Sequence, residues 1–229
     1  QGHAQYAPAP AVEGEKDRYV VTGYKSSYEY MDEFKMLFPR MHSAQSHHVT
    51  AYKSWADVKG KRIRYDYCGQ QKTEYCPTFG ENLKFFFRYQ VGFMYWRYFM
   101  WNFAGRQNDI QSHGELTKGR WISGIPFIDN TMYGDQSKLP TELRENKGHN
   151  VYYMLPLLLG LIGLCWQLGK RQNEGKNKEG YRSFAIVFLL FFLTGLAIVV
   201  YLNQTPYQPR ERDYAYAGSF YAFCIWIGL

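Results

Sequence analysis

Two long apolar runs separated by a basic segment dominate the hydrophobic pattern of the chain. Residues 151–168 and 183–202 carry no formal charge. As helices, both are long enough to cross a hydrocarbon core of roughly 30 Å. The intervening residues 169–182 hold five Lys or Arg and two Glu. Because positive loops stay on the cytoplasmic side, this pattern predicts a transmembrane hairpin with a cytoplasmic turn at 169–182.

A third apolar run, residues 214–229, follows two prolines and continues to the end of the sequence. We interpret it as a truncated third span, and the whole as an interior segment of a longer polytopic protein. The predicted fold class is therefore membrane α-helical, with two complete transmembrane helices and a truncated third. Residues 1–150 form a mixed α+β, loop-rich region ahead of them, which the cytoplasmic turn places on the opposite side of the membrane.

An aromatic-rich segment in this first region predicts one long helix at about residues 80–104. Thr78 and Glu81 have the spacing of a capping box at its start. Arg88 and Arg97 are nine residues apart, so they point to opposite sides of a helix. A free-standing span would leave one arginine in lipid. We expect a helix at the membrane interface or packed over the spans; a buried helix of a soluble domain is the alternative.

The composition changes this picture little. Aromatic residues make up 19% of the chain, which suits a membrane boundary because such rings have an apolar body and a polar edge. Residues 1–150 hold 20 Lys and Arg and 16 Asp and Glu, which accounts for +4 of the net charge of +7. This charge is too even for a nucleic-acid-binding face.

Cys68 and Cys76 flank a short polar loop in the region predicted to lie outside the cytoplasm. A disulfide is reasonable in an oxidising periplasm, and two unpaired thiols are the alternative. The apolar surroundings of Cys165 and Cys224 indicate packing residues.

Four consecutive charged residues, Arg210–Asp213, precede the third apolar run. Arginine holds a phosphate by paired hydrogen bonds, so Arg210 or Arg212 could bind the phosphate of a lipid-linked donor, with Asp213 helping to scaffold the site. The alternative is a salt-bridge cluster of alternating sign that fixes a loop to the outer region.

A second polar cluster, Arg106–Asp109, follows the aromatic helix directly. It could share a cleft with Arg210–Asp213 or only cap the helix, and Asp109 is the carboxylate to test as a base. His42, His47 and His48 read as polar loop histidines, because no Cys or carboxylate lies beside them at ligand spacing. The sequence predicts no metal site, phosphate-binding glycine loop or nucleophile elbow, and it requires no cofactor.

The phrases PTFGENLKFFFRYQVGFMYWRYFMWNFAGRQNDIQ (Pro77–Gln111) and YLNQTPYQPRERDYAYAGSFYAFCIWIGL (Tyr201–Leu229) resemble a family of large polytopic membrane proteins of Gram-negative bacteria. Leu37–Met41 also fits this resemblance. The family was long of unknown function and looks related to protein O-mannosyltransferases, within the C-type glycosyltransferase superfamily.

The resemblance implies a multi-pass protein of the bacterial inner membrane, with residues 1–150 in the periplasm. Its donor would be a polyprenyl-phosphate sugar, and its acceptor a protein Ser or Thr hydroxyl deprotonated by a carboxylate. In that superfamily the catalytic carboxylate lies in the first outer loop, which this sequence lacks. We therefore expect Arg210, Arg212 and Asp213 at most to bind the donor or scaffold the site, and the segment alone to be inactive.

A non-enzymatic membrane scaffold of an envelope or secretion assembly is the competing hypothesis. In an enzyme, the side chains of Arg210–Asp213 should converge on an open cleft beside the aromatic helix. In a scaffold, they should be paired with each other. A transporter fits less well, because neither complete apolar run has an ionisable residue at mid-membrane depth.

Overall fold

The computed structural model describes residues 3–9, 18–25, 31–43, 45–173, 178–208 and 212–229. Its α-helices are α1 (Ser46–Ala56), α2 (Phe79–Phe85), α3 (Arg97–Phe103), α4 (Pro126–Tyr133), α5 (Thr141–Arg144), α6 (Leu155–Asn173), α7 (Lys178–Phe192), α8 (Ile198–Leu202) and α9 (Ala217–Ile227). Two π-helical segments are η2 (Phe86–Trp96) and η4 (Leu193–Ala197). The 3-10 turns are η1 (Asp32–Phe34), η3 (Gln136–Lys138) and η5 (Asp213–Tyr216).

The strands form two-stranded antiparallel sheets: β1 (His3–Pro8) with β2 (Tyr19–Lys25), β3 (Lys61–Tyr67) with β4 (Gln70–Cys76), and β5 (Gly105–Arg106) with β6 (Asn150–Val151).

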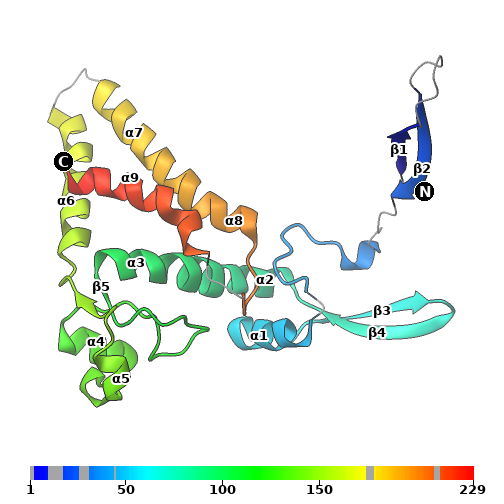
Figure 1. The fold of residues 1–229 in the computed structure, drawn as a ribbon, viewed down its shortest axis with the longest axis horizontal. Coiled ribbons are helices and arrows are strands. Elements are labelled where there is room, and N and C mark those ends of the chain that lie inside the picture. Colours follow the sequence, from blue (N-terminus) through cyan, green and yellow to red (C-terminus); the bar gives the residue numbers. More distant parts are fainter. Residues whose placement is uncertain (1–2, 10–17, 26–30, 44, 174–177, 209–211) are drawn as a thin grey trace.

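One continuous helix, made of α2, η2 and α3, forms the centre of the molecule (Figure 1). We call it the aromatic helix. The predicted capping box is present: the Thr78 hydroxyl accepts from the Glu81 backbone N–H, and the Glu81 carboxylate accepts from that of Thr78. Glu81 also accepts from the backbone N–H groups of Lys59 and Gly60. The cap therefore fixes both the start of the helix and the turn before β3.

The first half of the aromatic helix packs on α1. Phe85, Tyr89 and Phe93 recur every four residues, so they share one helix face. Tyr52 and Ala56 of α1 meet that face, and the members of this cluster are at most 9% exposed. The four-residue spacing of these rings thus gives the first half of the aromatic helix an apolar face that packs on α1, which lies below it in Figure 1.

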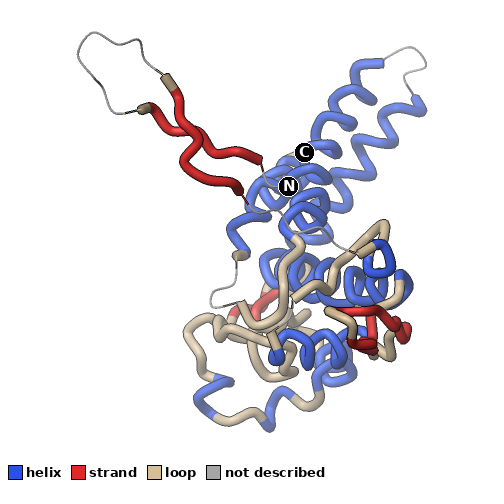
Figure 2. Tube along the Cα trace, turned by 90° about the vertical axis from the view of Figure 1, so that its right-hand side faces the viewer, coloured by secondary structure: helices blue, strands red, loops and turns tan. Residues whose placement is uncertain are grey.

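The second half packs on the apolar helices of the C-terminal part. Phe99 and Phe103 form a buried cluster with Leu157 of α6 and with Phe223 and Trp226 of α9. Half-buried rings of α7 complete this cluster. The aromatic helix thus packs on the apolar segments, one of the two arrangements expected for it, and a position at the membrane interface stays a prediction. Figure 2 shows α6 and α7 rising together from the rest of the molecule, joined by a thin grey trace.

Glycines allow α6 and α9 to approach each other closely. A Cβ added at Gly163 would lie 1.9 Å from the carbonyl oxygen of Trp226, and one at Gly160 would lie 2.3 Å from Cζ of Phe223. Small residues at such a crossing let helices pack backbone against side chain. Any larger residue would push α9 away from α6.

The predicted fold class, with two complete transmembrane helices and a truncated third, is wrong. Among the described helices, one stretch is long and apolar enough to cross a membrane, the 22 residues Tyr181–Leu202. The apolar part of α6, Leu155–Gly169, is shorter. The structure is a mixed α+β arrangement of helices with small sheets.

Local backbone geometry explains the shortened first run. Val151 pairs with Gly105 in the β5–β6 sheet, and Tyr153 and Met154 have positive φ angles of 52° and 58°. The predicted span 151–168 therefore loses its first four residues to a strand and a turn. The third run is an 11-residue helix that packs across α6 and α7, with Phe223 and Trp226 buried.

The expected disulfide between Cys68 and Cys76 is a second correction, because both thiols are free. Cys68 lies in the turn after Tyr67, whereas Cys76 pairs with Lys61 at the other end of the hairpin. At about 3.3 Å per strand residue, roughly 20 Å separates these ends. A disulfide requires Cα atoms within about 7 Å.

Candidate functional site

The loop that follows α8, residues 203–208, is fixed to the aromatic helix by a buried amide. Gln90 is 1% exposed, and its Nε2 donates to Oδ1 of Asn203 (2.8 Å) and to the carbonyl oxygen of Gln204 (3.1 Å). A buried amide with two such bonds is costly to displace. Asn203 and Gln204 are thereby held against the aromatic helix.

Arg40, in the segment Leu37–Met41, binds the end of α8 just before this loop. Its Nη1 donates to the carbonyl oxygen of Val200 (2.7 Å), a cation at a helix C-terminus. Burial lowers the pKa of the Arg40 guanidinium. Oδ1 of Asn82 accepts from the backbone N–H of Arg40 (2.7 Å), which ties this phrase to α2.

The side chains of the predicted polar cluster 106–109 have different contacts and different exposure. The Arg106 guanidinium stacks over the Trp101 ring at 4.0 Å. Gln107 and Asn108 are buried, and Oδ1 of Asn108 accepts from the backbone of the following loop. Asp109 remains exposed. The amides therefore shape the loop, and Asp109 is the member of the cluster that is open to solvent.

Two loops that are distant in sequence meet beside this cluster. Gln111 Nε2 donates to the carbonyl oxygen of Gln208 at 3.3 Å, and the rings of His113 and Tyr207 are 5.1 Å apart. Gln111 is two residues after Asp109, and Gln208 is two residues before Arg210. The structure thus brings the loop 203–208 beside the loop that follows the cluster 106–109.

A small pocket of about 130 Å³ lies between the second half of the aromatic helix and the polar cluster 106–109. Asp109 lines it, whereas Arg106 does not. Its other lining residues are Arg97, Tyr98, Trp101, Asn108, Ile110 and Gly119. The cleft predicted to hold both Arg106 and Asp109 therefore contains only the carboxylate.

Arg97 is a site residue that the sequence pattern did not reveal. It is 4% exposed, its guanidinium lies 4.6 Å from the Phe93 ring, and its Nη1 donates to the carbonyl oxygen of Gly119 (2.5 Å). Arg88 is exposed and pairs with Asp57 at 3.2 Å. One arginine is thus exposed and the other buried, and the burial of Arg97 depends on a loop more than 20 residues away.

The structure describes only part of the charged segment 210–213. Arg210 and Glu211 lie outside the described residues. Arg212 is exposed, and Asp213 begins the η5 turn. Neither the open-cleft nor the paired arrangement of these side chains is therefore tested, and both stay predictions.

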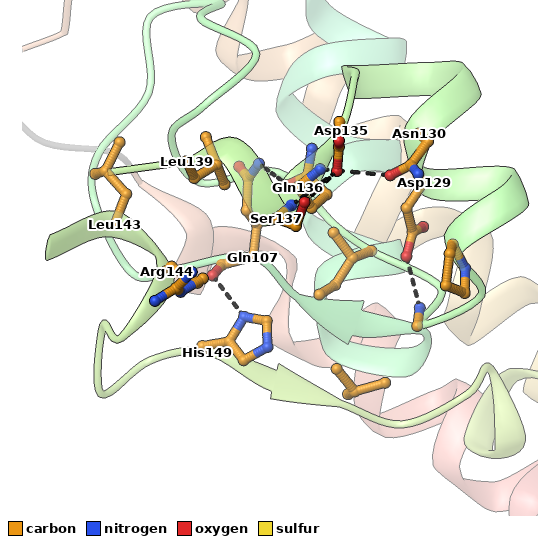
Figure 3. A pocket seen from close by; sticks show the side chains of 14 residues that line it. Gln107, Asp129, Asn130, Asp135, Gln136, Ser137, Leu139, Leu143, Arg144 and His149 are labelled. Carbon is orange, nitrogen blue, oxygen red and sulfur yellow. Dashed lines mark hydrogen bonds between the residues drawn. The ribbon is translucent and has the colours of Figure 1, made fainter. Parts of the chain in front are cut away.

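A second pocket of about 260 Å³ lies between α4, η3 and β6 (Figure 3). Gln107 reaches it from the polar cluster, and its carbonyl oxygen receives a hydrogen bond from Nδ1 of His149 (3.0 Å). Since a carbonyl can only accept, Nδ1 carries the proton and Nε2 of a neutral imidazole is left as an acceptor. The buried Asp129 at its edge accepts from Ser123 and Gly124 and so holds the loop before α4.

The three histidines of the α1 region do not form a metal site with their neighbours. The rings of His47 and His48 meet edge to face with centroids 4.3 Å apart, and His48 Nδ1 lies 2.8 Å from the Ser43 hydroxyl. Burial, followed by the proximity of His47, lowers the pKa of His48. Among the described residues, no group of three or more His, Cys, Asp or Glu side chains could hold a metal ion.

Comparison with known proteins gives one similarity. Residues 1–87 match a family of unknown function (DUF8416). No curated protein and no solved structure matches the chain. The similar part ends in the aromatic helix at Phe87, so it contains α1, the β3–β4 hairpin and the capping box, but not the polar cluster 106–109.

Proposed function

We propose that this chain belongs to a membrane-embedded glycosyltransferase that transfers a sugar from a polyprenyl-phosphate donor to protein Ser or Thr hydroxyls. The site would face the periplasm of a Gram-negative cell, with residues 1–150 on that side of the inner membrane. The observation that carries the proposal is the exposed apolar surface of α6, α7 and η4. Large exposed side chains there are Leu155, Leu158, Leu159, Leu161, Ile162, Trp166, Ile186, Phe188, Leu189, Leu190, Phe192 and Leu193.

An apolar surface of this kind needs a cover, because soluble proteins rarely expose such large contiguous patches. Only 11% of the most apolar window within Tyr181–Leu202 is buried. The length and the apolar composition of Tyr181–Leu202 fit the hydrocarbon core of a bilayer. This one stretch would lie in the bilayer.

The donor phosphate would bind where this apolar helix ends. Leu202 is the last residue of α8, and the loop 203–208 is then held against the aromatic helix. Arg212 follows at the same boundary and is exposed. A polyprenyl chain would lie along the apolar helices, and its phosphate would reach Arg212 and Arg210 through paired hydrogen bonds.

In the transfer step, the acceptor oxygen forms a bond to the anomeric carbon as the bond from that carbon to the donor phosphate breaks. The hydroxyl proton goes to a carboxylate, and the released polyprenyl phosphate keeps the bonding electrons. The resemblance assigns that base to an earlier outer loop. The arginines of this chain would hold the phosphate as negative charge develops on it.

Binding of polyprenyl phosphate by the chain in lipid nanodiscs tests the proposal. Arg212→Gln should weaken binding about tenfold or more, because it removes a charge-assisted hydrogen bond of about 1.5–3 kcal/mol. Arg62→Gln, on the exposed β3 strand, is the matched control and should leave binding unchanged. Equal binding by all three proteins, or equal binding to phosphatidylglycerol, would exclude a donor site at Arg212.

A non-enzymatic membrane scaffold remains the second candidate, and the β1–β2 hairpin favours it. This hairpin projects away from the helices (Figure 1) and exposes Tyr6, Tyr19 and Tyr24. Exposed aromatic side chains on a projecting strand pair suit contact with another protein. If the chain is a scaffold, substitution of all three tyrosines by Ser should disrupt an envelope complex, while Arg212→Gln should not affect glycan transfer in cells.

A further inference from the structure

The β3–β4 hairpin packs on little besides itself. Its strands pair along their whole length across a two-residue turn, and no residue of either strand is buried. In Figure 1 the hairpin projects away from the helices. A lone two-stranded hairpin is only marginally stable in water, so a further strand beside it would stabilise it.

The outer edge of β3 offers backbone groups to such a strand. Residues that flank a two-residue turn form a hydrogen-bonded pair, and such pairs alternate with non-hydrogen-bonded pairs along the ladder. Since Tyr67 pairs with Gln70 beside the turn, the backbone groups of Arg62, Arg64 and Asp66 point away from β4. Among the described strands, β3 is hydrogen-bonded to β4 alone. The edge is therefore open to an added strand.

The side chains along this edge complement a second copy of the same edge. If two antiparallel β3 strands are related by a two-fold axis at Tyr65, Arg64 of each copy lies opposite Asp66 of the other. On the other face of the sheet, Ile63 of each copy lies opposite Tyr67 of the other, and the two Tyr65 side chains are neighbours. Opposite charges and apolar side chains placed in this way both stabilise a sheet.

Other two-fold registers of β3 lack this match. An axis at Arg64 or at Asp66 would place two like charges directly opposite each other, and an axis at Ile63 would pair Arg62 with Arg64. Like charges in such pairs are destabilising. An axis at Tyr67 would bring the turn rather than the strand beside the second copy. The sequence of β3 thus favours one register.

The charged side chains of β3 are available for this contact. Within the described part of the chain, no hydrogen bond or ion pair engages the Arg64 guanidinium. Asp66 accepts from the backbone N–H of Gly69 through Oδ1 (2.9 Å), which leaves Oδ2 for a second donor.

The outer edge of β4 has a comparable pair of charges, Lys72 and Glu74, but these are already engaged. The ammonium group of Lys72 lies 4.5 Å from the centre of the Tyr67 ring. The Glu74 carboxylate accepts from the Tyr65 hydroxyl (2.9 Å). Both interactions hold the hairpin together, so β3 is the better edge for a second copy.

We propose that two copies of this chain associate through β3 and join their hairpins into one four-stranded antiparallel sheet. The strand order is β4–β3–β3–β4, with the two-fold axis at Tyr65. The interface is closed, because each copy uses the same edge for the other. This association does not depend on sugar transfer.

Charge reversal tests the register. Arg64→Asp and Asp66→Arg each turn both opposite-charge pairs into like-charge pairs, so each should raise the dissociation constant of the dimer about tenfold or more. An equimolar mixture of the two variants restores two opposite-charge pairs and should dimerise about as well as the unmodified chain. Sedimentation equilibrium in detergent, with one variant labelled, measures both effects. Because misfolded variants would not be restored by mixing, the mixture separates loss of contact from loss of fold.

Lys72→Glu, on the edge of β4, is the matched control and should leave the dissociation constant unchanged. Four results would overturn the proposal: a chain that stays monomeric, single variants that dimerise normally, a mixture without recovery, or a loss of dimer with Lys72→Glu alone. A monomeric chain would leave the β3 edge to a different protein.

A disulfide tests the position of the axis. In a chain whose four cysteines are changed to Ser, Tyr65→Cys would place two thiols directly opposite each other in a non-hydrogen-bonded pair, with Cα atoms about 4.5 Å apart. This separation suits a disulfide, so mild oxidation should link most of the protein into dimers. Thr73→Cys, which pairs with Arg64 on the other strand, is the control and should give few. Linkage through Thr73→Cys instead would show that β4 is the edge used.

Discussion

Single polar side chains fix distant chain segments to the aromatic helix, one near its start and one at its middle. Asn82, 1% exposed, accepts from the backbone N–H groups of Arg40 and Met41. Gln90 holds the loop after α8 in a similar way, by donating to Asn203 and Gln204. Because unsatisfied buried donors are costly, these two amides hold distant chain segments in one arrangement.

Glu81 makes the stability of this arrangement depend on pH. Burial acts to raise the pKa of its carboxyl, but hydrogen bonds from Thr78, Gly60 and Lys59 outweigh burial and lower the pKa below its ordinary value of 4.5. A depressed native pKa contributes stability above pH 4.5, and this contribution is lost as the pH falls through the native pKa. We expect Glu81→Gln to lower the melting temperature at pH 7 and to have a smaller effect near pH 3.5.

The matched control is Glu142→Gln, at an exposed glutamate of α5. It should change the melting temperature little at either pH. If Glu81→Gln lowers the melting temperature equally at both pH values, the ionised carboxylate is not the stabilising species.

At the scale of elements, the packing of α9 on α6 depends on the absence of side chains. Gly163 lies where any Cβ would meet the backbone of Trp226, whereas a Cβ at Gly169 on the same helix would meet nothing within 4 Å. The same substitution should therefore have opposite effects at the two positions.

Gly163→Ala should destabilise the protein by about 1–3 kcal/mol, the usual cost of overpacking. Gly169→Ala should stabilise it by up to about 1 kcal/mol through helix propensity. Thermal unfolding in detergent, followed by circular dichroism, measures both. Equal effects of the two substitutions would show that α6 and α9 do not cross at Gly163.

In the polar half, the start of the aromatic helix follows a local rule, whereas His47 and His48, read as loop residues, lie in α1. The capping box placed the start of the aromatic helix within one residue, since predicted residues 80–104 compare with Phe79–Phe103 in the structure. The rings on different faces of this helix could not be assigned to partners in advance, because both halves are aromatic. Contact with α1 or with α6 and α9 decides which rings become core.

At the scale of the whole molecule, the exposed apolar surface of α7 and η4 is the feature that a bilayer would explain. Leu193, 55% exposed, lies near the middle of Tyr181–Leu202. In lipid, Leu193→Arg should cost about 2.5–3.5 kcal/mol. In water, an exposed substitution usually changes stability by no more than about 0.5 kcal/mol.

The fraction of protein that resists carbonate extraction from membranes measures this difference. Leu193→Arg should reduce that fraction severalfold. Tyr201→Arg, at an 86% exposed position near the end of α8, should not, because an arginine there can reach the interface. Equal extraction of both variants and the unmodified chain would argue against lipid around α7.

The amino-acid sequence by itself determined the local structure. The capping box and the prolines after Leu202 act over a few residues, so the start of the aromatic helix and the end of α8 could be predicted. The contact between the loops at Gln111 and Gln208 was anticipated only as a cleft between two polar clusters.

Tertiary structure alone decided the roles of the apolar runs and of several polar residues. Hydropathy does not reveal that Val151 joins a strand, that α9 packs across α6 and α7, or that Cys68 and Cys76 lie at opposite ends of a hairpin. It also does not reveal the buried hydroxyl of Tyr52 or the burial of Arg97. Each of these depends on contacts between segments distant in sequence, whose free energy is realised only when the whole chain has packed.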